Sequence, residues 1–157
     1  MRVALYQPDI PQNAGTILRM TACVDVAADV IGPAGFDMSD RALKRAGMDY
    51  LHRVSLTQYT SFNAFQEARA AQSGRLVLLT TSGELPYTDF LFRADDTLLV
   101  GRESAGVPEN VHEAADARLI IPMQPGVRSL NVAIALAMVL GEALRQTGQF
   151  ARLSSQR

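Results

Sequence analysis

The region that most constrains the fold lies near the end of the chain, where residues 132–141 include no charged or strongly polar side chain. A surface helix needs a polar face, whereas a helix that is apolar all round must be covered on every side. This run of ten residues is too short for a membrane span, which takes about 20. We therefore predict a helix that ends near Gly148 and is covered on one side by a sheet of its own chain. Another partner must cover the other side, and a second copy of the chain is one candidate.

Upstream of this helix, short apolar runs alternate with segments of helical periodicity. We predict strands over residues 3–6, 26–32, 53–56, 76–79, 97–100 and 119–121. We predict helices over 13–25, 39–47 and 61–71, capped by Asn13, Ser39 and Ser61, and a short helix with Pro108 in its first turn. This alternation is typical of an α/β fold, in which a parallel sheet has helices on both faces. We expect a single domain over 1–150 and a C-terminal tail over 151–157.

The composition argues against several classes of protein. The net charge of −1 is unlike that of a strongly basic nucleic-acid-binding domain, although it leaves room for a local basic patch. The single cysteine, Cys23, excludes an intramolecular disulfide and suits a reducing compartment. We find no signal-peptide pattern, no membrane span and no metal-ligand spacing of cysteine and histidine. We therefore expect a cytoplasmic protein with no metal and no contact with a membrane.

Three loops are expected to meet at one edge of the sheet. They span residues 80–83, 101–108 and 123–131, and each follows a predicted strand. In parallel sheets, ligands bind beyond the carboxyl ends of the strands. The glycines of 101–108 suit a loop that wraps closely round a ligand, although an ordinary surface loop has the same pattern. This loop is neither a Walker phosphate loop nor a G-x-G-x-x-G dinucleotide motif.

Two helix starts add polar side chains to this edge. Ser129 and Asn131 are placed to cap the long helix, and the same helix start could hold a ligand through its backbone N–H groups. Asn13, Gly15 and Arg19 follow the first strand, where Gly15 leaves room for a phosphate or ribose and Arg19 shares its face of the helix. A capped helix with a solvated arginine is the alternative for this second motif.

Four segments in order resemble one known family. They are YQPDIPQNAGTILR (6–19), KRAGMDY (44–50), GRESAGVP (101–108) and IPMQPGVRSLN (121–131). Together they resemble the SPOUT superfamily of methyltransferases, and within it the small tRNA ribose methyltransferases that act on the wobble nucleotide. The resemblance covers about residues 1–150. It implies 2′-O-methylation of cytidine or uridine 34 in the tRNA anticodon loop, with S-adenosylmethionine bound in a C-terminal trefoil knot. It also implies a homodimer formed through the last helix.

The resemblance carries functional roles to individual residues of this chain. The implied cofactor pocket comprises Leu79, Thr80, Gly101, Glu103, Ile121, Met123, Ser129, Leu130 and Asn131. The implied catalytic positions are Asn13, Arg19, Glu103, Ser129 and Asn131. In this family the arginine at the position of Arg19 is assigned as the base. Because a guanidinium group stays protonated at neutral pH, a phosphate clamp or a stabiliser of the developing alkoxide is a physically easier role for Arg19.

RNA contacts are expected from basic side chains outside the pocket. One set is Arg41, Lys44, Arg45 and Arg53, and a second is Arg145, Arg152 and Arg157 of the tail. Arg19 is expected to contact the RNA as well, and an ordinary solvated surface is the alternative for each set. Methylation at another tRNA or rRNA site, or a non-catalytic nucleotide- or RNA-binding module, remains an alternative. A nicotinamide-dependent oxidoreductase is disfavoured, because no G-x-G-x-x-G motif follows the first strand. The sequence assigns no role to Arg102.

Overall fold

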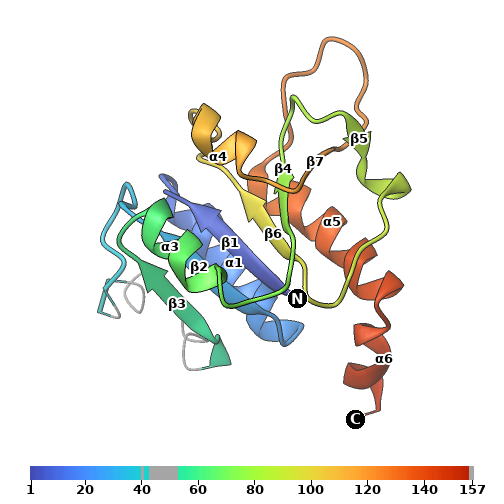
Figure 1. Ribbon diagram of the computed structural model, residues 1–157, viewed down its shortest axis with the longest axis horizontal. Coiled ribbons are helices and arrows are strands. Elements are labelled where there is room, and N and C mark those ends of the chain that lie inside the picture. Colours follow the sequence, from blue (N-terminus) through green and yellow to red (C-terminus); the bar gives the residue numbers. More distant parts are fainter. Residues whose placement is uncertain (40, 43–52, 156–157) are drawn as a thin grey trace.

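The structure is a computed structural model that describes residues 1–39, 41–42 and 53–155. Figure 1 shows a sheet with helices packed on its two faces. The strands are β1 Arg2–Tyr6, β2 Ala27–Ile31, β3 Leu56–Tyr59, β4 Leu76–Leu79, β5 Leu85–Pro86, β6 Thr97–Val100 and β7 Ala117–Ile120. The helices are α1 Pro11–Cys23, α3 Phe62–Arg69, α4 Glu109–Glu113, α5 Val132–Gln146 and α6 Gln149–Ser154, with a 3-10 turn η2 at Tyr87–Asp89.

The described strands form one seven-stranded sheet in the order β3-β2-β1-β6-β4-β7-β5. Every pairing is parallel, which confirms the predicted α/β architecture. The chain builds outward from β1 to β3, then returns to lay β6 directly against β1. This arrangement brings the carboxyl ends of β6, β4 and β7 next to one another. The trefoil knot stays a prediction, because strand order and pairing do not by themselves specify threading.

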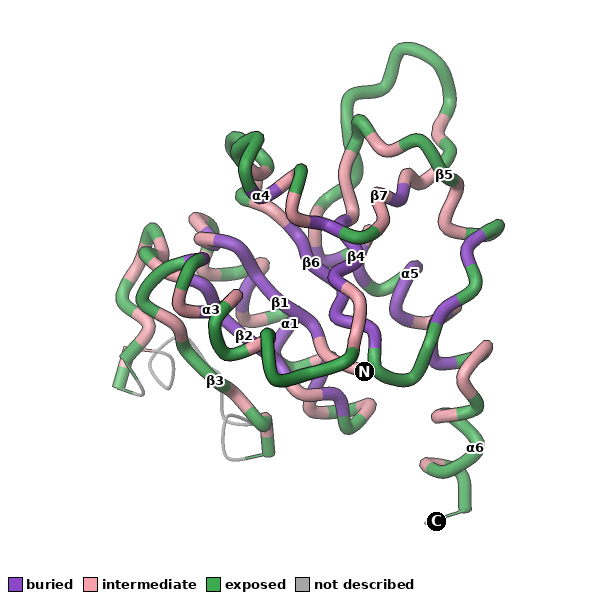
Figure 2. Tube along the Cα trace, in the orientation of Figure 1, coloured by how far each residue is buried: buried purple, intermediate pink, exposed green. Residues whose placement is uncertain are grey.

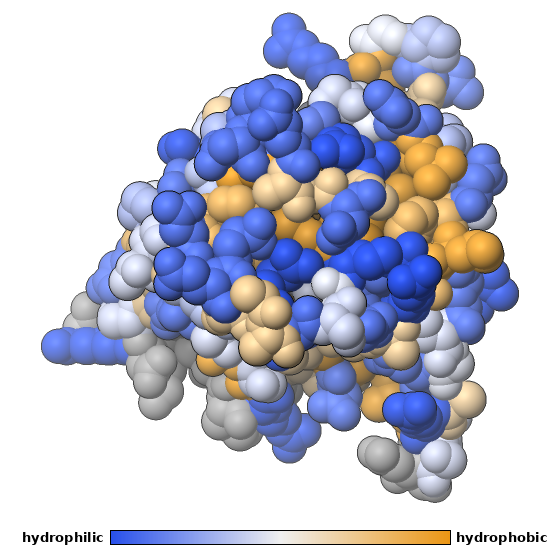
Figure 3. All heavy atoms as spheres, viewed as in Figure 1, coloured by the Kyte–Doolittle hydropathy of each residue, from blue (hydrophilic) through white to orange (hydrophobic). Residues whose placement is uncertain are grey.

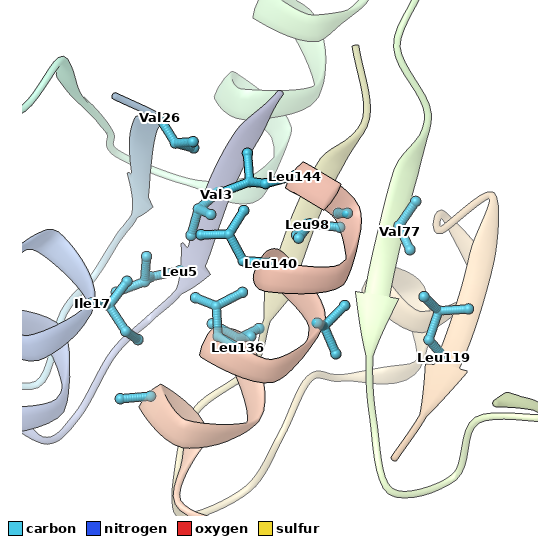
Figure 4. Close-up of a cluster of buried hydrophobic side chains, with 14 of the residues drawn as sticks. Val3, Leu5, Ile17, Val26, Val77, Leu98, Leu119, Leu136, Leu140 and Leu144 are labelled. Carbon is cyan, nitrogen blue, oxygen red and sulfur yellow. The ribbon is translucent and has the colours of Figure 1, made fainter. Parts of the chain in front are cut away.

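Alternate residues of the strands supply two separate cores. Val3 and Leu98 face α1 and α5, and Figure 4 shows them beside Leu136, Leu140 and Leu144 of α5. The intervening residues face the other way and pack against α3 and α4. That second core comprises Ala4, Tyr6, Ile31, Phe62, Phe65, Leu76, Leu78, Leu99, Val111 and Ala115. Figure 2 shows the buried strands between more exposed helices, and the prediction of helices on both faces is confirmed.

The long helix behaves as its sequence requires. The side-chain oxygen of Asn131 accepts hydrogen bonds from the N–H groups of Ala133 at 2.9 Å and Ile134 at 3.3 Å, so Asn131 caps α5 as predicted. The helix ends just before Gly148, which has a left-handed φ of 70°. Its own sheet covers one side of α5. On the other side the apolar Ile134 and Met138 are exposed by 55% and 40%.

Some predicted boundaries are wrong. Helix α1 begins at Pro11 with Ile10 as its N-cap, because proline is favoured at the first helical position, and so Asn13 lies inside the first turn. Strand β3 runs over Leu56–Tyr59 rather than 53–56, and β7 stops before Ile121. Pro108 is the N-cap of α4 rather than part of its first turn. The short strand β5 and helix α6 were not predicted.

Other predictions are confirmed or lie outside the described residues. Ser61 caps α3 by accepting from the N–H of Ala64 at 3.2 Å. Ser39 accepts from the N–H of Ala42 at 3.3 Å, but most of the predicted helix 39–47 falls outside the described part of the chain. Helix α6 crosses the expected boundary at residue 150, and the division into domain and tail stays a prediction. None of the described helices is both long and apolar enough to cross a membrane.

Candidate functional site

A cavity of about 460 Å³ lies at the carboxyl ends of β4, β6 and β7. The three predicted loops and the start of α5 surround it, and Figure 1 shows the loops after β4 and β7 at this edge of the sheet. All nine residues of the implied cofactor pocket line it: Leu79, Thr80, Gly101, Glu103, Ile121, Met123, Ser129, Leu130 and Asn131. Asn13, from α1, also lines the cavity. The structure therefore brings together residues that span most of the chain.

Glycines shape the loop after β6. The N–H of Arg102 donates to the carbonyl of Gly106 at 2.9 Å, and the N–H of Gly106 donates back to the carbonyl of Arg102 at 2.8 Å. A side chain on Gly101 would place its Cβ 2.6 Å from the carbonyl carbon of Gly106, so only glycine permits this closure. Gly106 itself has a φ of 65°, a conformation that glycine adopts without strain. The loop is therefore a tight backbone hairpin at the cavity wall.

A pair of asparagines joins two walls of the cavity. The side-chain nitrogen of Asn131 donates to the side-chain oxygen of Asn13 at 2.9 Å. The same Asn131 uses its oxygen to cap α5. Sequence reasoning assigned a cap to each asparagine, but only Asn131 is one. Asn13 instead ties α1 to the start of α5.

The carboxylate of Glu103 enters the cavity next to a second carboxylate, Asp9. The N–H of Asp9 donates to Glu103 at 3.2 Å, and the N–H of Glu103 donates to Asp9 at 3.0 Å. Burial, and then the neighbouring Asp9 side chain, raise the pKa of Glu103, while a hydrogen bond with Asn13 opposes this shift. Hydrogen bonds with Glu103 and Ser104 hold the pKa of Asp9 well below its usual range. Sequence reasoning missed Asp9, although it lies within the first family-like segment.

Of the basic side chains expected to contact RNA, those that the structure describes lie outside the cavity. Arg19 is exposed on α1 and does not line the pocket of its own chain. Arg41 and Arg53 are exposed, whereas Lys44 and Arg45 fall outside the described residues.

The second expected set is weaker as a candidate for binding RNA. The guanidinium of Arg145 forms an ion pair with Glu142 at 2.7 Å. Arg152 is exposed on α6, and Arg157 falls outside the described residues. Arg102 lines the cavity and donates to Gln7 at 3.4 Å. Within the described ranges, no group of three or more His, Cys, Asp or Glu residues is placed to hold a metal ion.

Comparison with known proteins identifies the family. Residues 1–141 match the family model described as the SpoU rRNA Methylase family. The chain belongs to this family. The predicted resemblance to the SPOUT methyltransferases is thereby confirmed.

Relatives match over almost the whole chain. A protein from Beijerinckia indica is 62% identical over 151 residues, which cover 96% of this chain and 94% of the relative. A protein from Escherichia coli K12 is 37% identical over 150 residues, 94% of each chain. Both are named tRNA (cytidine(34)-2′-O)-methyltransferase.

Solved structures share the fold. One, described as giving structural insights into the 2-OH methylation of C/U34 on tRNA, superposes with a TM-score of 0.85 at 43% identity, covering 92% of this chain and 94% of the other. The SpoU methyltransferase AviRb from Streptomyces viridochromogenes, in complex with AdoMet, superposes with a TM-score of 0.81 at 30% identity. That match covers 93% of this chain and 60% of AviRb.

The cavity suits S-adenosylmethionine by size and chemistry. Its volume of about 460 Å³ lies within the range of small-molecule sites, about 300–1,000 Å³. Leu79, Ile121 and Leu130 line the cavity and offer apolar surface to an adenine ring or to the methylene groups of the ligand. The strand ends and the tight loop at Gly101 supply backbone N–H and C=O groups for polar edges.

Proposed function

We propose that the chain is an S-adenosylmethionine-dependent methyltransferase that methylates the ribose 2′-hydroxyl of the wobble nucleotide, cytidine or uridine 34, in tRNA. One observation carries the proposal: a single cavity at the carboxyl edge of the sheet collects all nine implied cofactor residues. The wobble position is supported by the relative at 62% identity that is named for cytidine 34. The tRNA substrate and the single Cys23 favour a cytoplasmic location.

Different residues of the pocket bind the ligand and align it for the reaction. When bound, S-adenosylmethionine supplies an electrophilic methyl group. Leu79, Ile121 and Leu130 hold the apolar parts of the ligand, and the Gly101 loop limits its position through rigid backbone. Because the methyl group is already reactive, the protein has mainly to align the hydroxyl with it, and alignment supplies several kcal/mol of the barrier.

Charged and polar side chains prepare the hydroxyl. We assign Arg19 to clamp a phosphate or to stabilise the developing alkoxide, since a guanidinium group is a poor proton acceptor at neutral pH. Glu103, Asn13 and Asn131 form a hydrogen-bonded wall on the cavity. This wall fixes the orientation of the polar groups that face the substrate. Ser129, also on the cavity lining, is placed to donate a further hydrogen bond.

A homodimer through α5 completes the proposed site. The exposed Ile10, Val127, Leu130, Ile134 and Met138 carry apolar surface on α5 and the segments beside it, and a second copy would cover this surface. Such an arrangement lets Arg19 of one chain face the pocket of its partner, which accounts for its absence from the pocket of its own chain. The tRNA anticodon loop would then contact Arg41, Lys44 and Arg45.

Methyl transfer from radiolabelled S-adenosylmethionine to tRNA from a strain without this protein tests the proposal. The labelled nucleotide is then mapped. Label on the ribose of nucleotide 34 is the expected result. Label at another tRNA position or on rRNA would keep the chemistry and overturn the substrate. No label despite measurable binding of S-adenosylmethionine would overturn the catalytic proposal in favour of a non-catalytic RNA-binding module.

A further inference from the structure

Asp9 connects the loop before α1 to the loop after β6 through three hydrogen bonds. One carboxylate oxygen accepts from the backbone N–H of Glu103 at 3.0 Å, and the other accepts from the hydroxyl of Ser104. The backbone N–H of Asp9 donates to the carboxylate of Glu103 at 3.2 Å. The two residues thus hold each other by reciprocal contacts between backbone and side chain across 94 positions of sequence.

The backbone on the other side of Asp9 is equally fixed. The N–H of Gly35 donates to the carbonyl of Pro8 at 2.8 Å. A Cβ added to Gly35 would lie 3.0 Å from the Cα and 3.1 Å from the Cβ of Asp9. Asp9 is therefore packed between Gly35 and the loop after β6, and it has little freedom to move away from Glu103.

These contacts determine where Glu103 points. With its N–H held by one Asp9 oxygen and its carboxylate held by the Asp9 N–H, Glu103 stays on the cavity lining beside Asn13. We propose that Asp9 is a positioning residue for methyl transfer, which acts by holding Glu103 in the pocket. This inference rests on the proposed role of Glu103 in the reaction.

Charge supports the geometric argument. Two carboxylates side by side repel, which raises the pKa of one of them, and hydrogen-bond donors to the charged form oppose this rise. Here the hydroxyl of Ser104 and two backbone N–H groups are the compensating donors. The pKa of Glu103 is raised, first by burial and then by Asp9, so Asp9 also tunes the group that it positions.

A double-mutant cycle tests the proposal. Asp9→Asn keeps the size of the side chain and one acceptor oxygen but removes the charge and the second acceptor. We expect Asp9→Asn to lower kcat by about tenfold in the wild-type background and by less than about twofold in a Glu103→Gln background, since a residue that acts through another has no effect when the other is absent. Asp9→Glu restores the carboxylate and should recover most of the missing kcat.

A second variant reaches the same contact without altering any carboxyl group. Gly35→Ala places a methyl group against Asp9, and we expect kcat to fall while the KM for S-adenosylmethionine changes less than about twofold. Thermal unfolding and circular dichroism of each variant establish that the protein is folded before kinetics are compared.

The outcomes separate this inference from the proposed function. Equal reductions in kcat from Asp9→Asn in both backgrounds, or no recovery in Asp9→Glu, would overturn the positioning role while leaving the methyltransferase intact. Wild-type kcat for Glu103→Gln alone would remove the role of Glu103 and the inference with it. Failure of the proposed function would show itself earlier, as absence of methyl transfer by the wild-type protein.

Discussion

The side-chain nitrogen of Asn131 donates to the side-chain oxygen of Asn13 at 2.9 Å, which joins the start of α5 to the first turn of α1 across 118 positions of sequence. Asn131 therefore has two tasks, since its oxygen caps α5 and its nitrogen holds Asn13. Asn13 in turn interacts with Glu103. If residue 131 could no longer donate a hydrogen bond, the Asn13 amide could bond to it only after rotating, and its oxygen would then face the carboxylate of Glu103.

Replacing Asn131 with Asp separates the two tasks. An aspartate still caps the helix, and its negative charge interacts favourably with the positive end of the helix dipole, but it has no N–H to donate to Asn13. We expect the free energy of unfolding of Asn131→Asp to stay within about 0.5 kcal/mol of the wild-type value, and its rate of methyl transfer to fall about tenfold. Asn131→Ala should abolish both tasks, with an added cost of about 1 kcal/mol in stability. Urea unfolding and initial rates measure the two effects.

Ser61→Ala is the matched control for the removal of a cap. Ser61 caps α3, which does not line the cavity. The Ser61→Ala variant should therefore be destabilised about as much as Asn131→Ala but keep full activity. If Asn131→Asp were as active as the wild type, the bridge between the asparagines would have no part in the reaction.

Glu103→Gln should make the protein more stable and less active. The pKa of Glu103 in the folded protein is raised above its ordinary 4.5, mainly by burial, so the folded state binds the proton more tightly than the unfolded state. Stability therefore falls as pH rises from 4.5 through the folded pKa. Above both values the penalty is fully present, and Gln removes it. We expect a higher Tm for Glu103→Gln at pH 8 and a difference that vanishes below about pH 4.

Thermal unfolding of both proteins across this pH range measures whether the Tm difference has the expected direction. Glu109→Gln is a suitable control, because Glu109 is exposed on α4 and away from the cavity lining. A lower Tm for Glu103→Gln than for the wild type at pH 8 would contradict the argument from burial.

Periodicity was enough to predict most strands, because the central strands are buried on both faces and read as unbroken apolar runs. Leu76–Leu79 and Thr97–Val100 were predicted at their observed bounds. The two-residue strand β5 is too short to leave a pattern. Asn13 looked like a cap, but Pro11 starts the helix earlier, and the role of Asn13 depends on a partner far away in sequence.

The full cavity lining was predicted by resemblance to a family, whereas the residues alone indicated the three loops and the two helix starts beside them. Asp9 shows the limit of both approaches. Its partners, Glu103 and Ser104, come from a loop 94 and 95 residues later, and no local spacing signals that contact. The proposed position of Arg19 at the pocket of a partner chain is equally invisible to sequence, because it would depend on assembly.

Removing basic side chains tests the first RNA-binding set. Each cationic side chain that neutralises a phosphate of single-stranded RNA adds about 0.7 to the steepness of log affinity against log salt, so its removal should flatten the slope by that amount. We expect the triple variant with Gln at Arg41, Lys44 and Arg45 to bind tRNA more weakly, with a flatter slope. Arg93→Gln serves as the control, because Arg93 is exposed, precedes the amino end of β6 and does not line the cavity. An unchanged slope in the triple variant would exclude this set from the tRNA interface.

A charge on the apolar side of α5 should disrupt the proposed dimer. Ile134 is 55% exposed, so Ile134→Glu costs little in a monomer but buries a carboxylate in an interface. We expect light scattering after size exclusion to change from dimer to monomer mass, with methyl transfer abolished. Leu91→Glu is the control, since Leu91 is 80% exposed and is not part of the proposed interface surface. Figure 3 shows that apolar patches lie among the polar ones on this face of the molecule, so a control at an exposed apolar side chain is needed. Dimers that persist in Ile134→Glu would place the interface elsewhere.

Arg19→Lys should separate binding from turnover. Lysine keeps the positive charge, so tRNA affinity should stay within about twofold, but it lacks the planar fork of donors that aligns two oxygens at once. Because removal of a preorganised donor to a developing oxyanion typically costs about 10²-fold or more, we expect kcat to fall by about a hundredfold. Single-turnover kinetics with saturating tRNA measure this reduction directly.

Mixing Arg19→Lys with a pocket variant such as Asn131→Ala should restore part of the activity, since mixed dimers would hold one site with both wild-type residues. Near-normal turnover in Arg19→Ala would exclude both the clamp and the alkoxide role, and failure of the mixed dimers to recover would exclude the placement of Arg19 at the pocket of its partner.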